Sequence, residues 1–455
     1  MKIKKKQRII KIYALVCLLT LFLAIRNGKK LESSINNIVS AQSLNFERGS
    51  YKADKNDFDN SYSFYDTKKY SNLSSAIKAI GREKATLMVS NEQVVNANQT
   101  IPDNVTLKFE RGGRLYITSG TLKIYGTIEA GIYRIFRYDK TISTTPVLFC
   151  NNSPGIVYPQ WWGAGENNSV HNSVNADDTS AMQAAINSLN NGGTVLIPKG
   201  NYKISDTLRL KNSVSLIGPE LRNGNDVYIN YYGRSSAIQC YLPAGRYVGG
   251  FSDIVISGVT LIDVNNTGLI GFDLKGFRRC ELRNTRIIGF DRSLYLKQSC
   301  YAKITDVSVS KSREYGVYLD DQCNNTLFTN LKIAATTQAC KNDVNILTSS
   351  NVNFVNLLME GDIKGLNIYR SNAVLINGLY AEHIGSIRDY VINSFRSNGT
   401  VVIAPYINGN NKIKFGVTSD KESSTTILGG RISNCIHPYL DIKAISTINV
   451  SGATS

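Results

Sequence analysis

Residues 254–261 read IVISGVTL, and the same pattern returns along the chain every 21 to 26 residues. Each copy holds two short runs of alternating apolar residues, separated by one small polar residue or glycine. The later copies are CELRNTRI (280–287), AKITDVSV (302–309), TLFTNLKI (326–333), VNFVNLLM (352–359) and AVLINGLY (373–380). Short strand-like runs at a fixed period, with no helical segments between them, are typical of a repeat protein whose units stack on one another.

A third strand precedes each pair. These strands read GFDLK (271–275), SLYLK (293–297), GVYLD (316–320), DVNIL (343–347) and GLNIY (365–369). Three strands per unit predict an all-β fold, a right-handed parallel β-helix (a β-solenoid with three short strands per coil) with a short N-terminal capping helix. The turn residues are predicted to align from coil to coil, with their side-chain amides hydrogen-bonded along the stack. They are Gly258, Asn284, Asp306, Asn330, Asn356 and Asn377.

The clearest helical segment lies before the repeats. Residues 179–189 place Met182 and Ile186 on one face, and two glycines at 192 and 193 end the segment. Asp178 stands at the position of the N-cap. We expect this helix to cover the open end of the solenoid, whose unpaired strand edges would otherwise favour aggregation.

The lead into the repeats resembles a known family. The stretches that carry the resemblance are NVTLKFERGGRLYITSGTLKIYGTIEAG (104–131), PQWWGA (159–164), ADDTSAMQAAI (176–186) and GGTVLIPKGNYKIS (192–205). They resemble the start of the pectate-lyase superfamily domain shared by rhamnogalacturonase- and epimerase-like proteins and by many phage tailspikes. The resemblance implies a parallel β-helix that acts on or binds polysaccharide. Its tailspike members imply a homotrimer.

In the related polygalacturonases, catalytic signatures lie just before the first strand of successive coils. The corresponding places here read Arg313–Gly316, Asn342-Asp343 and Ile363–Gly365. Only Asp343 keeps an expected carboxylate, and Lys364 stands where a histidine is expected. The resemblance therefore implies the fold more strongly than polygalacturonase-type hydrolysis.

The outward residues of the first strand of each coil form the candidate site. Alternation places Leu294 and Leu296 inward and Tyr295 and Lys297 outward. The predicted catalytic residues are Asp273, Lys297, Asp320 and Asp343. The predicted substrate-binding residues are Lys275, Tyr295, Tyr318, Asn345, Asn367 and Tyr369. Tyrosine rings can stack on sugar faces, and lysines can pair with carboxylates.

Two chemistries remain open for this surface. Asp273 and Asp320 are two coils apart, about 10 Å, close to the roughly 6.5–9.5 Å of inverting glycosidases. In a lyase, Lys275 or Lys297 would neutralise a uronate carboxylate or abstract its α-proton, with Ca²⁺ at Asp320-Asp321 as an optional cofactor. The alternatives are a non-catalytic glycan-binding adhesin or tailspike-like protein, and a purely structural surface protein.

Composition and charge indicate a partner and a compartment for the protein. The formal net charge is +17, and residues 1–30 hold nine basic and no acidic residues, which leaves +8 for the remainder. A mildly basic surface suits an acidic polysaccharide. Nucleic acid is disfavoured, because the body of the chain has no dense Lys/Arg block. The scattered histidines and the absence of a CxxC pair predict no metal site.

The basic start and the apolar run 12–25 predict a signal peptide over residues 1–30, or an uncleaved anchor. This places the protein outside the cell or in the cell envelope, with membrane contact only through that segment. Residues 31–71 are predicted to be a polar linker, 72–158 a lead-in β segment, and 159–455 the β-helix, with a loop insertion near 221–250.

Overall fold

The computed structural model describes residues 63–138, 146–151, 154–165, 177–219, 226–240, 253–334, 337–361, 364–382, 388–446 and 449–451, and the structural statements below concern these residues. The predicted signal peptide and most of the predicted linker lie outside them. Among the described residues, no helix is long and apolar enough to cross a membrane.

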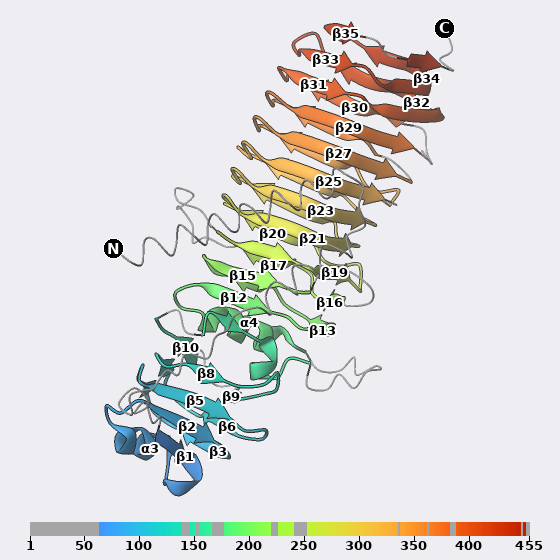
Figure 1. The fold of residues 1–455 in the computed structure, drawn as a ribbon. Helices are drawn as coiled ribbons and strands as arrows, with labels where there is room; N and C mark the ends of the chain where they lie inside the picture. The colour runs from blue at the N-terminus through green and yellow to red at the C-terminus, as the bar shows by residue number, and fades with distance from the viewer. Residues whose placement is uncertain are drawn as a thin grey trace, which may run out of the picture. The chain divides into compact units, whose positions relative to one another are not determined.

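The main part of the fold is a ladder of 26 strands in which each strand pairs in parallel with its equivalent one coil later (Figure 1). The predicted parallel β-solenoid is therefore confirmed. The first strands of the central coils are β20 (Ile270–Lys275), β22 (Arg292–Lys297), β24 (Tyr315–Asp320), β26 (Asn342–Leu347), β28 (Leu366–Tyr369) and β30 (Arg388–Phe395).

The second and third predicted strands of each central coil are joined into one bent strand. These are β21 (Glu281–Ile288), β23 (Lys303–Ser310), β25 (Leu327–Ala334), β27 (Asn353–Glu360) and β29 (Leu375–Glu382). The bend lies at the small polar residue of the repeat, where φ is +46° at Asn284, +53° at Asp306 and +54° at Asn330. Glycine, asparagine and aspartate tolerate this left-handed conformation best, which explains their recurrence.

The predicted amide stack is present, with one correction to its members. Asn330 Nδ2 donates to Asp306 Oδ1 at 2.8 Å, and Asn356 Nδ2 donates to Asn330 Oδ1 at 3.1 Å. In the next coil Val355 pairs with Asn377. Gly378, with φ +73°, therefore occupies the bend in place of the predicted Asn377.

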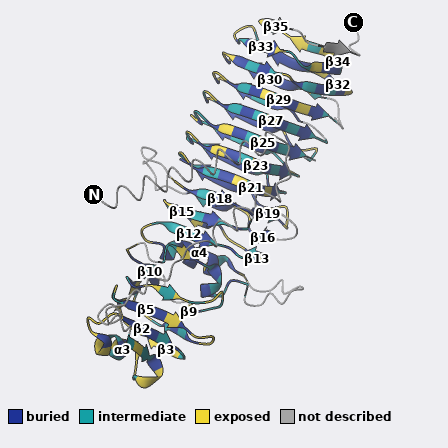
Figure 2. Cartoon of the chain, in the orientation of Figure 1, coloured by how far each residue is buried: buried dark blue, intermediate teal, exposed yellow. Residues whose placement is uncertain are grey.

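The interior of the coils is filled by the inward residues of every strand. Phe272, Leu294, Val317 and Val344 succeed one another in register and are fully buried. Figure 2 shows buried positions along the whole ladder. Phe328 and Phe354 stack inside with their ring centroids 4.6 Å apart.

The lead-in segment is itself built of parallel strands in three small sheets. Its first strand, β1 (Ser63–Asp66), pairs with β2 (Ala85–Val89), so β1 lies inside the stretch predicted to be linker. Helix α3 (Leu73–Ile80) follows β1 and buries Leu73, Ala76 and Ile80. The remaining strands are β3 (Glu92–Val95), β4 (Gln99–Ile101), β5 (Val105–Phe109), β6 (Arg114–Ile117), β7 (Leu122–Ile124), β8 (Ile128–Glu129), β9 (Phe136–Tyr138) and β10 (Val147–Phe149).

The predicted helix before the repeats is α4 (Thr179–Ser188). It packs against β10 of the lead-in and β14 (Leu208–Leu210) of the main ladder, so both of its sides are occupied. The side chain of Asp178 does not cap it. Its two oxygens accept hydrogen bonds from the backbone N–H groups of Gly165 and Lys203, while Asp177 Oδ1 accepts from Thr179 N.

The predicted loop insertion near 221–250 holds two strands of the ladder. Strand β16 (Val227–Tyr231) pairs with β13 (Gly200–Ile204) and β19 (Val259–Asp263), and β17 (Ser236–Cys240) pairs with β14 and β20. Val227, Ile229 and Tyr231 alternate into the core and are fully buried. This alternation is the signal that the sequence analysis missed.

Candidate functional site: a polar ribbon on the outer face of strands β20 to β28

Eight of the ten predicted site residues form two adjacent rows, which we call the ribbon. In the first row, Asp273, Tyr295, Tyr318, Asn345 and Asn367 are successive partners from β20 to β28. In the second row, Lys275, Lys297 and Asp320 are successive partners. The register thus brings together residues that are up to 94 positions apart in the chain.

Asp273 belongs to the ribbon but is covered. The residue is only 1% exposed. Its Oδ2 accepts hydrogen bonds from Ser236 Oγ at 3.1 Å and Gln239 Nε2 at 2.7 Å, and it pairs with Lys275 Nζ at 3.2 Å. In this arrangement Asp273 anchors the base of the ribbon and does not reach a bound polymer.

Asp320 lies at the centre of a more open group. Its Oδ2 accepts a hydrogen bond from the Tyr295 hydroxyl at 2.7 Å and pairs with Lys297 Nζ at 3.2 Å. Burial raises the pKa of Tyr295 above its ordinary value, and the hydrogen bond to Asp320 raises it further. Tyr295 therefore stays protonated at neutral pH and acts as a hydrogen-bond donor.

The register weakens the two-carboxylate interpretation. Asp320 is two coils away from Asp273 and also two residues further along its strand. The two steps of about 4.8 Å and two of about 3.3 Å combine to roughly 12 Å between backbone positions. The estimate of about 10 Å from sequence omitted the second component. Roughly 12 Å exceeds the 6.5–9.5 Å separation typical of inverting glycosidases.

Asn345 and Asn367 of the ribbon belong to a second ladder of side-chain amides. Asn367 Nδ2 donates to Asn345 Oδ1 at 2.9 Å, and Asn393 Nδ2 donates to Asn367 Oδ1 at 2.9 Å. Tyr369 stacks on Phe395 with centroids 5.7 Å apart. Part of the hydrogen-bonding capacity predicted for substrate is thus used between coils.

Asp343, predicted as a catalytic residue, lies outside both rows. It is 2% exposed, and its Oδ2 accepts hydrogen bonds from Lys364 N at 2.7 Å and Gly365 N at 3.0 Å. A carboxylate that receives two backbone N–H groups of a tight turn is occupied in holding that turn. Gly365 at this turn has φ +85°.

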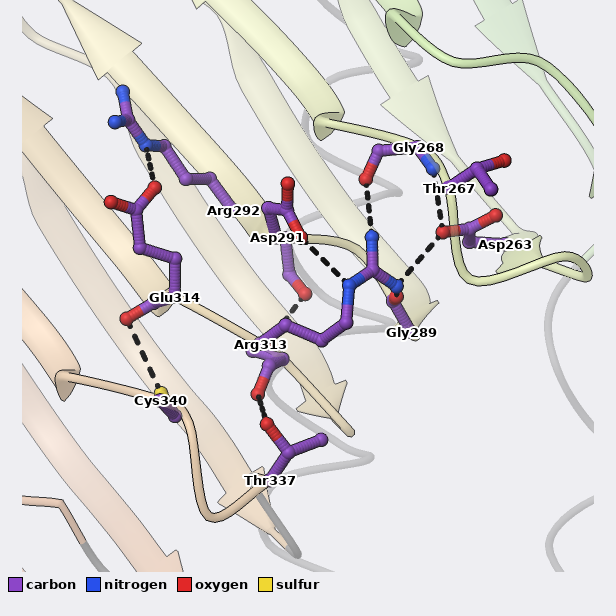
Figure 3. Close-up of polar contacts among 12 residues, drawn as sticks. Asp263, Thr267, Gly268, Gly289, Asp291, Arg292, Arg313, Glu314, Thr337 and Cys340 are labelled. Carbon is purple, nitrogen blue, oxygen red and sulfur yellow. Dashed lines mark hydrogen bonds and ion pairs between the residues drawn. The ribbon is translucent and has the colours of Figure 1, made fainter.

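Four residues beside the ribbon were not predicted as site residues: Arg292, Glu314, Tyr315 and Lys341. Arg292 Nε donates to Glu314 Oε2 at 2.8 Å (Figure 3). Lys341 Nζ donates to Glu314 Oε1 at 2.8 Å. The Arg292 guanidinium also lies 5.3 Å from the ring centroid of Tyr318 and 5.8 Å from that of Tyr315. Strict alternation places Arg292 inward with Leu294, so period two could not identify it. The alternation breaks at the start of β22, where Ser293 and Leu294 are both fully buried and the Arg292 side chain is 34% exposed.

The positive charges of Arg292 and Lys341 change the pKa of Glu314. Burial alone would raise the pKa of its carboxyl group, but the hydrogen bonds and charges of Arg292 and Lys341 outweigh burial and lower it below its ordinary value. Glu314 is therefore ionised over the whole neutral range.

The sequence predicts Ca²⁺ at Asp320-Asp321 only if the protein is a lyase. The contacts of these two residues do not fit a calcium site. Asp321 Oδ2 accepts a hydrogen bond from Gln298 Nε2 at 2.8 Å, while Asp320 is paired with Lys297. Ca²⁺ takes six to eight oxygen ligands. Within the described ranges, no three acidic, histidine or cysteine side chains converge as a metal site.

Comparison with known proteins supports the fold. The family model "Rhamnogalacturonase A/epimerase, pectate lyase-like" matches residues 168–227, which confirms the resemblance predicted from the lead-in motifs. This segment includes α4 and the first coils but not the ribbon. No curated protein matches the chain.

The chain is also similar, at low sequence identity, to several solved structures. ORF18 of Geobacillus virus E2 is 15% identical over 65% of this chain and 61% of its own, with a TM-score of 0.48. The A-module of mannuronan C-5 epimerase AlgE4 from Azotobacter vinelandii is 16% identical over 61% of this chain and 92% of its own, with a TM-score of 0.45. The surface protein and adhesin PfbA of Streptococcus pneumoniae is 13% identical over 65% of this chain and 100% of its own, with a TM-score of 0.33.

Proposed function

We propose that this chain is an exported protein that binds an acidic polysaccharide along the ribbon. The observation that carries the proposal is the in-register placement of Lys275 and Lys297 beside Tyr295 and Tyr318. The lysine side chains are 34% and 32% exposed, so their ammonium groups are within reach of a ligand. A polymer aligned with the stack would meet equivalent positions on successive coils. The family match at 168–227 also supports a polysaccharide ligand.

The binding test compares acidic and neutral polysaccharides at low and high salt. We expect the purified chain to bind a polyuronate, and Lys275→Gln/Lys297→Gln to weaken this binding about tenfold or more, because two charge-assisted contacts are lost. Lys332→Gln is the matched control, since Lys332 lies on β25, outside the ribbon strands, and is also paired with a carboxylate, Glu360. Equal binding by all three proteins, or no binding of any polyuronate by the wild type, would contradict the proposal.

Cleavage of the bound polymer is a second candidate, favoured by the Tyr295–Asp320–Lys297 group. In β-elimination, a base removes the C-5 proton of a uronate, the C4–O bond breaks, and a C4=C5 double bond forms. One of Lys275 and Lys297, as the ammonium ion, would neutralise the carboxylate, and the other, as the neutral amine, would take the proton. The protonated Tyr295 hydroxyl would give a proton to the leaving oxygen. Hydrolysis through Asp273 and Asp320 has less support, because Asp273 is buried and the pair is widely spaced.

Product analysis separates these outcomes. Unsaturated uronate ends, lost in Tyr295→Phe, would select the lyase. New reducing ends without unsaturation, lost in Asp320→Asn, would select a glycosidase. Binding without either product would select a non-catalytic adhesin or tailspike-like role. The predicted homotrimer and the export signal are tested separately, by light scattering and by fractionation of cells.

A further inference from the structure

Arg292 is held in place through one of its nitrogens only. Its Nε donates to Glu314 Oε2, and Glu314 is itself fixed by Lys341 from the next coil. Three aromatic rings surround the guanidinium, those of Tyr295, Tyr315 and Tyr318, at 5.3–5.8 Å from their centroids. These contacts restrict the rotamers of Arg292 and so reduce the entropy that a ligand would have to remove.

The two terminal nitrogens of Arg292 are left for another partner. In the part of the chain that the structure describes, neither donates a hydrogen bond. Figure 3 shows both pointing away from Glu314. The side chain is 34% exposed, so the terminal nitrogens remain accessible while the rest of the side chain is packed. A planar pair of N–H donors of this kind matches the two oxygens of a carboxylate.

Arg313 in the neighbouring coil provides an internal comparison. All three of its nitrogens are used: Nε with Asp291 Oδ1, Nη1 with Asp263 Oδ2 and Gly289 O, and Nη2 with Gly268 O (Figure 3). Its side chain is 21% exposed. The same residue type thus serves two purposes on adjacent coils: Arg313 is saturated by the fold, and Arg292 is not.

We infer that the Nη1–Nη2 edge of Arg292 binds the carboxylate of one uronic acid unit in a bidentate manner, with Tyr315 and Tyr318 beside the sugar ring. This inference rests on the proposed function and identifies the subsite that distinguishes acidic from neutral sugars. Lys341, with a side chain 60% exposed, adds positive charge at the same place. Glu314 acts as a positioning residue, because it orients Arg292 through Nε without occupying the terminal edge.

The test uses oligogalacturonate, oligomannuronate and their carboxyl-reduced counterparts as probes for the full chain. We expect Arg292→Gln to weaken binding of the preferred acidic oligosaccharide about tenfold or more and to leave binding of the reduced one unchanged. Arg292→Lys keeps the charge but loses the planar pair of donors, so it is expected to recover only part of the loss. Arg283→Gln, on β21 outside the ribbon strands, is the matched control for loss of one exposed arginine, and it should bind as the wild type does.

The outcomes separate this inference from the proposed function. If the wild type binds acidic oligosaccharides and both Arg292 variants bind them equally well, the Arg292 subsite is wrong while the proposed function stands. If the wild type binds neither the acidic nor the reduced probes, both are wrong. Should Arg292→Gln fail to fold, as judged by its melting transition, Arg292→Lys decides: undiminished preference for acidic over reduced probes would overturn the subsite.

Discussion

Replacing Arg313 is expected to cause the largest loss of stability among the charged residues beside the ribbon. Arg313 joins three coils, because it pairs with Asp291 at 2.7 Å and with Asp263 at 3.0 Å and also donates to the carbonyl of Gly268 at 2.7 Å. The Asp263 side chain is 0% exposed. In Arg313→Gln this carboxylate keeps only the hydrogen bond from Gly268 N at 2.8 Å.

The magnitude follows from the buried charge that remains. Removing one partner of a buried ion pair costs about 3–5 kcal/mol, because the other charge is left without compensation in a medium that solvates it poorly. Arg292→Gln breaks a more exposed pair with Glu314 and is expected to cost about 1 kcal/mol or less. The two substitutions are chemically identical and lie on neighbouring coils, so their difference reports the deeper burial and the additional hydrogen bonds of Arg313.

Chemical denaturation of the two variants and the wild type measures this difference, since the midpoint at unchanged slope reports stability. Hydrogen exchange of the amides of β19 and β20 shows whether the loss is local, as expected for a solenoid whose coils contact only their neighbours. A loss below about 1 kcal/mol in Arg313→Gln, or an equal loss in Arg292→Gln, would refute the assignment of Arg313 as a buried clamp.

Two further predictions concern Glu314 and the bend of the repeat. Because the pKa of Glu314 is lowered in the folded state, its ionised form stabilises the fold above its unfolded pKa, and this contribution is lost as the pH falls through the folded value. The melting temperature of the wild type should therefore exceed that of Glu314→Gln at pH 7, and the gap should close as the pH falls from the ordinary pKa of glutamate through the lower folded value. At Gly378, φ is +73° and an added Cβ would lie 3.1 Å from Asn356 Oδ1. Gly378→Ala is therefore expected to lower the free energy of unfolding by about 1–2 kcal/mol, as measured by denaturation. Gly378→Asn should cost clearly less, because asparagine tolerates this φ and can extend the amide ladder; equal losses would show that backbone conformation does not select the residue.

The repeat itself made the stacking of coils predictable. Inward residues such as Phe272 and Leu294 follow from period two, and the positive φ of Asn330 follows from the residue types at the bend. The one-residue error at Asn377 arose because Asn and Gly are adjacent there and both suit the left-handed conformation. Only the pairing of neighbouring coils decides between them.

The burial of the ribbon residues could not be predicted from period two. Alternation predicts on which face of a strand a side chain lies, but it does not predict whether other residues cover that face. Asp273 points outward from β20 and is nevertheless buried by Ser236 and Gln239, which come from the coil before it. Arg292 was missed for the opposite reason: alternation places it inward with Leu294, but Ser293 and Leu294 are both buried and the Arg292 side chain is partly exposed. Both cases depend on contacts between residues more than 20 positions apart.

The register of the coils connects these structural features with the proposed binding surface. A slip of one residue in any strand would exchange inward and outward positions and would bury Lys297 while exposing Leu294 and Leu296. The ladder from Asp306 through Asn330 to Asn356 and the Arg313 clamp both fix the alignment of neighbouring coils. Substitutions at these positions, remote from any ligand, should therefore reduce polysaccharide binding in proportion to the fraction of molecules whose coils lose alignment. Substitutions at Lys297 or Arg292 should instead reduce binding with the fold intact, and the ratio of binding loss to stability loss distinguishes the two kinds of residue.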